Sequence, residues 1–177
     1  MSWTVRAKGA NDKKAVLAVV WAAFSGHGRD GDAEVDIVMR TWALAVGPED
    51  LDLVAVDDGA IVGHALGAIG DLEGREALAV APLCVTPSRQ GEGIGSSLMA
   101  ELLARARVAG WPIVMVLGDP GYYERFGFEP AGPLGIYYCP VGRDDPHFQV
   151  CRLATPDLSL RGEFRYCWEG PNGSAST

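Results

Sequence analysis

The sequence lacks several features that would assign it to a familiar class of protein. No apolar run approaches the roughly 20 residues that a helix needs to cross a bilayer, and no signal-peptide pattern is visible, so we expect no membrane association. Basic residues are in deficit, with 15 Lys and Arg against 23 Asp and Glu. The resulting net charge of −8 argues against a nucleic-acid partner, which would require a basic face.

Histidine is also scarce, and the cysteines are not closely spaced in pairs. The chain has three histidines and four cysteines, and no C-x-x-C spacing occurs among them, so we expect no metal site. Scattered cysteines without an export signal predict reduced thiols and a cytoplasmic location. The cysteines are Cys84, Cys139, Cys151 and Cys167.

Length and composition are those of an ordinary globular domain. The chain has 177 residues, of which 48% are hydrophobic and 21% charged, which is enough for a substantial core. We therefore predict a single domain over residues 1–168. Residues 169–177 are rich in Gly and Ser without an apolar pattern, and they predict a flexible tail.

Hydrophobic periodicity predicts alternating helices and strands. Asn11 is the expected N-cap of the first helix, and Asp57-Asp58-Gly59 the expected tight hairpin turn. Residues 70–74 are read as a turn, and residues 131–146, rich in Gly and Pro, as irregular. Strands are predicted at 3–7, 52–56, 61–69, 78–85, 113–117, 148–153 and 163–166, and helices at 11–24, 34–45, 94–109 and 120–126.

The most informative stretch is a strand, a glycine turn and a helix start in succession. The apolar run 78–85 predicts a buried strand, and Gly91, Gly93 and Gly95 follow at alternate positions. Ile94, Leu98, Leu102 and Ala106 then lie on one stripe of a helix. A helix start leaves about four backbone N–H groups unpaired and carries roughly half a positive charge, so the order predicts anion binding.

A diphosphate is the natural ligand for such a turn, and two familiar templates do not fit. The Walker loop needs a Lys after its last glycine, and none follows here. The dinucleotide fingerprint needs its third glycine three residues after the second, whereas Gly95 stands two after Gly93.

The segment Gln90-Gly91-Glu92-Gly93-Ile94-Gly95 does fit Q/R-x-x-G-x-G/A, and there the sequence resembles the GNAT (GCN5-related) N-acetyltransferase family. Residues 122–128, YYERFGF, resemble the later Y-x-x-x-G-F motif of that family. The lead-in 116–120, VLGDP, is similar to a YhbS-like bacterial subgroup. Two motifs in order, about thirty residues apart, are far more specific than one glycine loop. The resemblance is strong over 78–130.

The resemblance implies a fold, a cosubstrate and a reaction. The implied fold is a GNAT-like α/β (α+β) domain with a mixed, mostly antiparallel central sheet flanked by helices on both faces. The implied reaction is direct transfer of an acetyl group from acetyl-CoA to a primary amine of a small molecule or peptide. Acetyl-CoA and an amine-bearing acceptor are the expected partners, and a homodimer is one expectation for assembly.

The same resemblance assigns roles to individual residues. Tyr123, four residues before Gly127, is the expected general acid toward the departing thiolate. A backbone N–H near Leu83 is expected to polarise the thioester carbonyl. The implied cofactor-binding set is Leu83, Cys84, Val85, Arg89, Gln90, Gly91, Gly93, Ile94, Gly95, Ser96 and Tyr123.

Each of these assignments has a plainer alternative. Tyr123 could be a core aromatic, Arg89 a solvated surface charge, and Cys84 a small buried hydrophobic residue rather than an acylated nucleophile. The general base is left open among His64, Glu73, Glu76 and water.

Two other functions compete with the enzymatic one. A non-catalytic module could sense acyl-CoA without turnover, and a different enzyme could use the same loop for another phosphate. The acceptor is not encoded in a motif; residues 24–34, 66–76 and 131–147 are the segments expected to select it.

Overall fold

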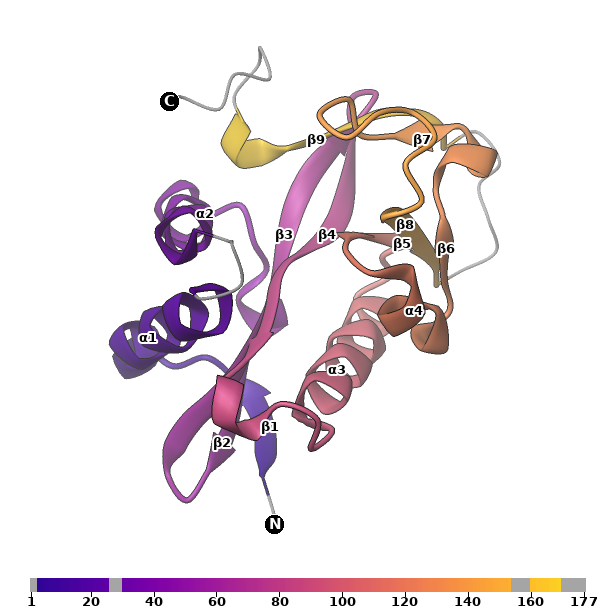
Figure 1. Ribbon diagram of the computed structural model, residues 1–177. Helices are drawn as coiled ribbons and strands as arrows, with labels where there is room; N and C mark the ends of the chain where they lie inside the picture. The colour runs from indigo at the N-terminus through magenta and orange to yellow at the C-terminus, as the bar shows by residue number, and fades with distance from the viewer. Residues whose placement is uncertain (1–2, 26–29, 154–159, 170–177) are drawn as a thin grey trace. The chain divides into compact units, whose positions relative to one another are not determined.

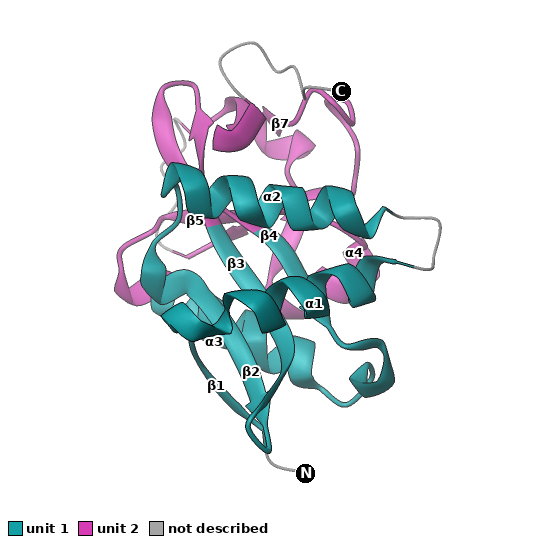
Figure 2. Cartoon of the chain, turned by 90° about the vertical axis from the view of Figure 1, so that its left-hand side faces the viewer, with its two compact units in different colours: residues 1–67, 81–105 teal, residues 68–80, 106–177 magenta. Residues whose placement is uncertain are grey.

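A computed structural model describes residues 3–25, 30–153 and 160–169 (Figure 1). The chain forms two compact units, residues 1–67 with 81–105 and residues 68–80 with 106–177 (Figure 2). The strands are β1 Thr4–Ala7, β2 Asp52–Asp57, β3 Ala60–Leu72, β4 Arg75–Val85, β5 Ile113–Leu117, β6 Phe128–Pro130, β7 Ile136–Tyr137, β8 Phe148–Arg152 and β9 Gly162–Tyr166. The α-helices are α1 Lys13–Phe24, α2 Gly31–Leu44, α3 Ile94–Val108 and α4 Pro120–Tyr123.

The strands of the first unit are antiparallel and joined at a tight hairpin. β1 pairs with β2, and β2 pairs with β3 through a register that includes Val54 opposite His64. Asp58 and Gly59 both have positive φ, 46° and 77°, as a two-residue hairpin of the mirror-image type requires. The predicted turn at Asp57-Asp58-Gly59 is therefore confirmed.

Helices cover both faces of these strands. On one face, α1 and α2 enclose a hydrophobic cluster with the strands, and Figure 2 shows the two helices on the same side of β2 and β3. On the other face, a Cβ at Gly63 would meet Leu98 and Ile94 of α3 at 2.9 and 3.1 Å, so glycine allows α3 to approach closely. The buried members of the cluster are Val16, Val19, Val20, Val38, Val54, Leu66 and Cys84.

The second unit contains parallel as well as antiparallel strand pairs. β4 and β5 pair in parallel from Leu78 opposite Val114 to Val80 opposite Val116. β8 pairs antiparallel with both β5 and β6, β9 pairs antiparallel with β3, and the short β7 pairs in parallel with β9. The expected mixed, mostly antiparallel sheet with helices is confirmed.

Two helix starts differ from the sequence prediction. Asn11 is not an N-cap, because residues 10–12 form a 3₁₀ turn and α1 begins at Lys13. The Asp12 carboxylate instead accepts from the Gly9 N–H at 2.7 Å and pairs with Arg6, which lowers the pKa of Asp12. The second helix begins at Gly31, three residues earlier than predicted, because Asp30 caps it by accepting from the Asp32 N–H at 2.9 Å.

The predictions for the β3–β4 turn and for residues 131–146 also differ from the structure. β3 continues to Leu72, and the turn lies at Glu73 and Gly74, not over 70–74. Gly70 lies within the strand because it pairs with Tyr166 of β9, and the Phe164 ring occupies the space that a side chain would take there. Within 131–146, read as irregular, β7 gains its hydrogen bonds from β9, which lies distant in sequence.

The predicted C-terminal tail is only partly described. The Glu169 carboxylate accepts from the Tyr138 O–H, and it accepts from the Tyr166 N–H at 3.1 Å. Residues 170–177 lie outside the described part of the chain. The single domain over 1–168 stays a prediction.

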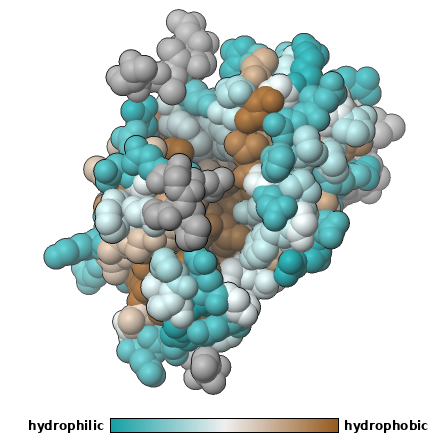
Figure 3. Space-filling view, viewed as in Figure 1, coloured by the Kyte–Doolittle hydropathy of each residue, from teal (hydrophilic) through white to brown (hydrophobic). Residues whose placement is uncertain are grey.

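The viewed surface is mostly hydrophilic, with hydrophobic residues gathered in smaller patches (Figure 3). Exposed large hydrophobic side chains among the described residues are Trp21, Met39, Leu44, Val108 and Leu117. None of the helices in the described ranges is long and apolar enough to cross a membrane.

Candidate functional site

The turn between β4 and α3 adopts a backbone that two of its glycines make possible. Gly91 and Gly93 have φ of 81° and 92°, which L side chains rarely adopt. α3 begins at Ile94, so Gly95 lies in its first turn. The predicted order of strand, glycine turn and helix start is therefore present.

The first backbone amides of α3 precede the hydrogen-bonded part of the helix. Its first hydrogen bond here runs from the Ser97 N–H to the Gly93 carbonyl at 3.0 Å. The N–H groups of Ile94, Gly95 and Ser96 precede that bond and have no intrahelical acceptor. Donors at the positive end of the helix dipole can bind a phosphate.

Side chains hold both ends of this turn. Gln90 donates from Nε2 to the Val85 carbonyl at 3.1 Å, which ties the turn to the end of β4. Trp3 donates from Nε1 to Ser97 Oγ at 3.3 Å, beside Gly93. Sequence analysis missed Trp3, because nothing local connects residue 3 with residue 97.

Arg89 is engaged by two carboxylates. Its Nε donates to both carboxylate oxygens of Glu92 at 3.0 Å, and its Nη1 donates to Asp57 Oδ2 at 2.7 Å. Nη2 also lies 3.0 Å from Glu92 Oε2. These two acids raise the pKa of Arg89. The Arg89 guanidinium links the glycine turn to the β2–β3 hairpin, and its expected contact with the cofactor stays a prediction.

The end of β4 carries Leu83, Cys84 and Val85. Cys84 is 5% exposed and belongs to the hydrophobic cluster under α1 and α2. Burial raises the pKa of Cys84 to about 12. A thiol held neutral among apolar side chains is a poor nucleophile, which favours the plainer interpretation of this residue.

Tyr123 lies at the end of α4 in the second unit, and local capping explains its position. The Asp119 carboxylate accepts from the Gly121 N–H at 3.0 Å, and Pro120 opens the helix, both as predicted. A left-handed Gly127, φ 86°, follows the next 3₁₀ turn, in agreement with the expected helix end.

The Tyr123 ring is half-buried among aromatic and glycine neighbours. Its centroid lies 5.0 Å from that of Tyr122 and 5.6 Å from that of Phe128, both edge to face. A Cβ at Gly118 would overlap the Tyr123 ring. Gly118 therefore sets the ring position, a role that sequence analysis missed although Gly118 directly precedes the predicted cap.

A buried polar network surrounds His64 in the first unit. The His64 side chain is fully buried, and its Nε2 lies 2.7 Å from Asp52 Oδ1. Asp52 Oδ2 accepts from Trp42 Nε1 at 2.8 Å and lies 3.3 Å from Lys8 Nζ. His64 Nδ1 has no partner among the described residues. The network joins α2, β2, β3 and Lys8, which directly follows β1, through one carboxylate.

Replacing Asp52 with alanine is expected to lower the free energy of unfolding by about 3–5 kcal/mol, because Lys8 and His64 would lose their shared buried acceptor. Urea unfolding measures the change. Asp36→Ala is the control, because Asp36 and Arg40 form an exposed pair, with side chains 54% and 39% exposed, and such pairs contribute at most about 1 kcal/mol. Similar losses in both variants would contradict a structural role for the network.

The other two candidate bases are exposed. Glu73 lies in the β3–β4 turn and accepts from the Glu163 N–H at 3.0 Å, and Glu76 lies at the start of β4. No group of three or more His, Cys, Asp or Glu side chains in the described ranges is arranged to hold a metal ion.

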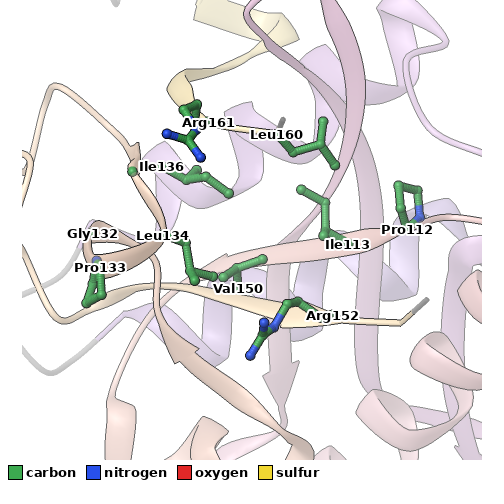
Figure 4. Close-up of a pocket in the computed structure, with 11 residues that line it drawn as sticks. Pro112, Ile113, Gly132, Pro133, Leu134, Ile136, Val150, Arg152, Leu160 and Arg161 are labelled. Carbon is green, nitrogen blue, oxygen red and sulfur yellow. The ribbon is translucent and has the colours of Figure 1, made fainter. Parts of the chain in front are cut away.

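A pocket of about 370 Å³ lies within the second unit (Figure 4). Its lining is mainly aliphatic and includes Leu134, Ile136 and Val150, with the guanidinium-bearing side chains of Arg152 and Arg161 beside them. Arg152 pairs with Glu129 at 2.6 Å. Part of the lining belongs to 131–147, one of the segments expected to select the acceptor; residues 26–29 of another lie outside the described chain.

All four cysteines are free thiols. In the native protein at pH 8 we expect Cys139, which is exposed, to react first with a disulfide reagent and Cys84 last. With its pKa raised to about 12, roughly one Cys84 in 10⁴ is thiolate at that pH. Mass spectrometry of timed samples gives the order, and denaturant should release all four. Early modification of Cys84, or fewer than four thiols in denaturant, would contradict this assignment.

Comparison with known proteins gives the family. The acetyltransferase (GNAT) domain model matches residues 48–130. The chain is 34% identical over 140 residues to the uncharacterized N-acetyltransferase YjhQ of Escherichia coli K12, covering 75% of this chain and 77% of YjhQ. It is 36% identical over 112 residues to the uncharacterized N-acetyltransferase YhbS of the same strain, covering 62% of this chain and 66% of YhbS.

Solved structures agree with the sequence relatives. The E. coli YhbS structure in complex with CoA has a TM-score of 0.83 at 30% identity, covering 93% of this chain and 89% of that one. A GNAT family acetyltransferase of Brucella melitensis in complex with acetyl-CoA has a TM-score of 0.76 at 30% identity, covering 93% of this chain and 96% of that one. The chain belongs to the GNAT acetyltransferase family.

Proposed function

We propose that this protein is an acetyl-CoA-dependent N-acetyltransferase that transfers the acetyl group directly to a primary amine of a small molecule or peptide. The observation that carries the proposal is the left-handed turn at Gly91 and Gly93, which leads into the first backbone amides of α3. The relatives described as complexes with CoA and acetyl-CoA support the choice of cosubstrate. Free thiols and the acidic charge accord with a cytoplasmic location, and a homodimer stays a prediction.

In this proposal the diphosphate of CoA binds the amides from Gly91 to Ser96. Glycine at 91 and 93 removes the Cβ atoms that would keep a phosphate from the backbone. The backbone of Leu83, Cys84 and Val85 runs beside the pantetheine arm. The Leu83 N–H polarises the thioester carbonyl and stabilises the oxyanion that forms on it.

The reaction forms one bond and breaks one. The neutral amine nitrogen donates its electron pair to the acetyl carbon, which becomes tetrahedral. The intermediate then collapses, the C–S bond breaks, and the electron pair leaves on the sulfur of CoA. Tyr123 donates its phenolic proton to that sulfur, so CoA departs as a thiol. The nitrogen loses a proton to a base and the product is an amide.

The identity of that base stays open. His64 offers only Nδ1, because Nε2 faces Asp52, and the whole side chain is enclosed. Glu73, Glu76 or water would accept the proton from the solvent-exposed side. A pH profile of each single variant with a good acceptor would separate these candidates.

The test is acetyl-CoA turnover against a broad amine library, with CoA release followed by a thiol reagent and CoA affinity by calorimetry. The proposal expects CoA binding and amine-dependent release of CoA. Binding without turnover on any amine would identify an acyl-CoA sensor. Absence of CoA binding, with ATP or NAD bound instead, would assign the loop to another nucleotide.

A further inference from the structure

We infer that Arg89 is a positioning residue: together with Asp57 and Glu92 it holds the glycine turn in the shape that binds the CoA diphosphate, and it is not itself a ligand of the phosphates. We call Arg89, Asp57 and Glu92 the carboxylate clamp. The inference rests on the proposed function, in that the turn is taken to bind CoA.

The carboxylate clamp connects the glycine turn, through Glu92, with the end of β2, through Asp57. Glu92 lies between Gly91 and Gly93, and its carboxylate returns to Nε and Nη2 of Arg89, three residues earlier. Asp57 ends β2, 32 residues away in sequence, and receives Nη1 at 2.7 Å. The side chains of Arg89, Asp57 and Glu92 are 22%, 17% and 25% exposed, so the contacts between them are partly sheltered from water.

Such a link matters because the contacts of Gln90 and Trp3 hold only the two ends of the turn, which leaves its middle to be ordered. Glycine is the residue with the most backbone freedom, and two left-handed glycines flank Glu92. Ordering such a segment at the moment of binding would reduce affinity, whereas ordering it in advance does not. The β2–β3 hairpin is a fixed anchor, since its strands are paired within the sheet.

Charge also argues against Arg89 as a phosphate ligand. One guanidinium between two carboxylates leaves a net charge of −1, so the clamp as a whole does not attract an anion. Moving the guanidinium to a phosphate would leave Asp57 and Glu92 without their partner beside a second anion. Binding therefore depends on backbone amides and the helix dipole, which carry no competing acid.

The two roles of Arg89 predict opposite effects for a change at Asp57. If Arg89 positions the turn, Asp57→Asn and Arg89→Gln each weaken CoA binding about five- to tenfold, and the double variant is no weaker than Arg89→Gln alone. If Arg89 is a phosphate ligand, Asp57→Asn frees the guanidinium and CoA binds equally well or more tightly. Calorimetry with CoA gives the affinities.

Asp58→Asn is the matched control, because it removes the same charge one residue further along the hairpin. We expect it to bind CoA like the parent. Weakening by Asp58→Asn equal to that by Asp57→Asn would overturn the clamp in favour of a general charge effect. If the parent protein binds CoA and the Asp57→Asn variant binds it equally well or more tightly, the clamp inference is overturned directly.

Hydrogen exchange in the ligand-free protein tests the clamp without CoA. Asp57→Asn and Arg89→Gln should both speed exchange of the amides in residues 86–97, whereas Asp58→Asn should not. Unchanged exchange in both clamp variants would overturn the inference. A parent that fails to bind CoA would reject the proposed function, and the exchange rates would still decide whether the clamp orders the turn.

Discussion

Replacing Tyr123 with phenylalanine is expected to lower the rate of acetyl transfer by about 10²–10⁴-fold, or roughly 3–5 kcal/mol of barrier, while CoA affinity stays nearly unchanged. The phenol acts on charge that develops on sulfur only as the C–S bond breaks, so its loss affects the transition state more than the bound ground state. Single-turnover rates with the best amine acceptor, together with CoA calorimetry, separate the two effects.

Phenylalanine is a suitable replacement because it keeps the packing. The ring at position 123 would still lie edge-on to Tyr122 and Phe128 and against Gly118, and thermal unfolding checks that this packing is kept. Tyr122→Phe is the control: successive side chains of a helix point roughly 100° apart. If both variants turn over like the parent, Tyr123 is a core aromatic and water is the proton donor to sulfur.

Replacing Gly93 with valine is expected to weaken CoA binding at least about 100-fold, equivalent to about 2.7 kcal/mol. A φ of 92° is unfavourable for a β-branched residue, and the new side chain would occupy the approach to the amides. The nearest side chain to an added Cβ at this position is Trp3, at an ordinary contact distance of 3.9 Å. Calorimetry with CoA measures the change.

Gly74→Val controls for backbone strain alone. Gly74 has φ of 81° and no atom within 4 Å of its Cβ position, and it lies in the β3–β4 turn. The Gly74→Val variant should lose some stability and still bind CoA. Undiminished CoA affinity in a folded Gly93→Val variant would remove the glycine turn as the diphosphate site.

Local signals explain why most elements could be predicted. The stripe of Ile94, Leu98, Leu102 and Ala106 is buried in α3, with each side chain at most 1% exposed. β5 has the predicted bounds, Ile113–Leu117. In both segments the apolar pattern and its breakers lie within a few residues, so sequence alone carries the information.

Elements that depend on distant partners were missed or misplaced. β6 and β7 are three and two residues long, too short for periodicity, and exist because β8 and β9 supply hydrogen bonds. Gly70, read as a turn residue, is extended because it pairs with Tyr166 of β9, and the Phe164 ring packs against it.

The sequence by itself determined the glycine turn at the start of α3, the cap of α4 and the family resemblance, because glycine conformation and helix capping depend on adjacent residues. Only the tertiary structure decided what the charged and polar side chains contact. Arg89 pairs with Asp57 across 32 residues, and His64 faces Asp52 across a strand pair. A charged group takes whichever opposite charge folding brings within reach, and that choice is made by strand register rather than by local sequence.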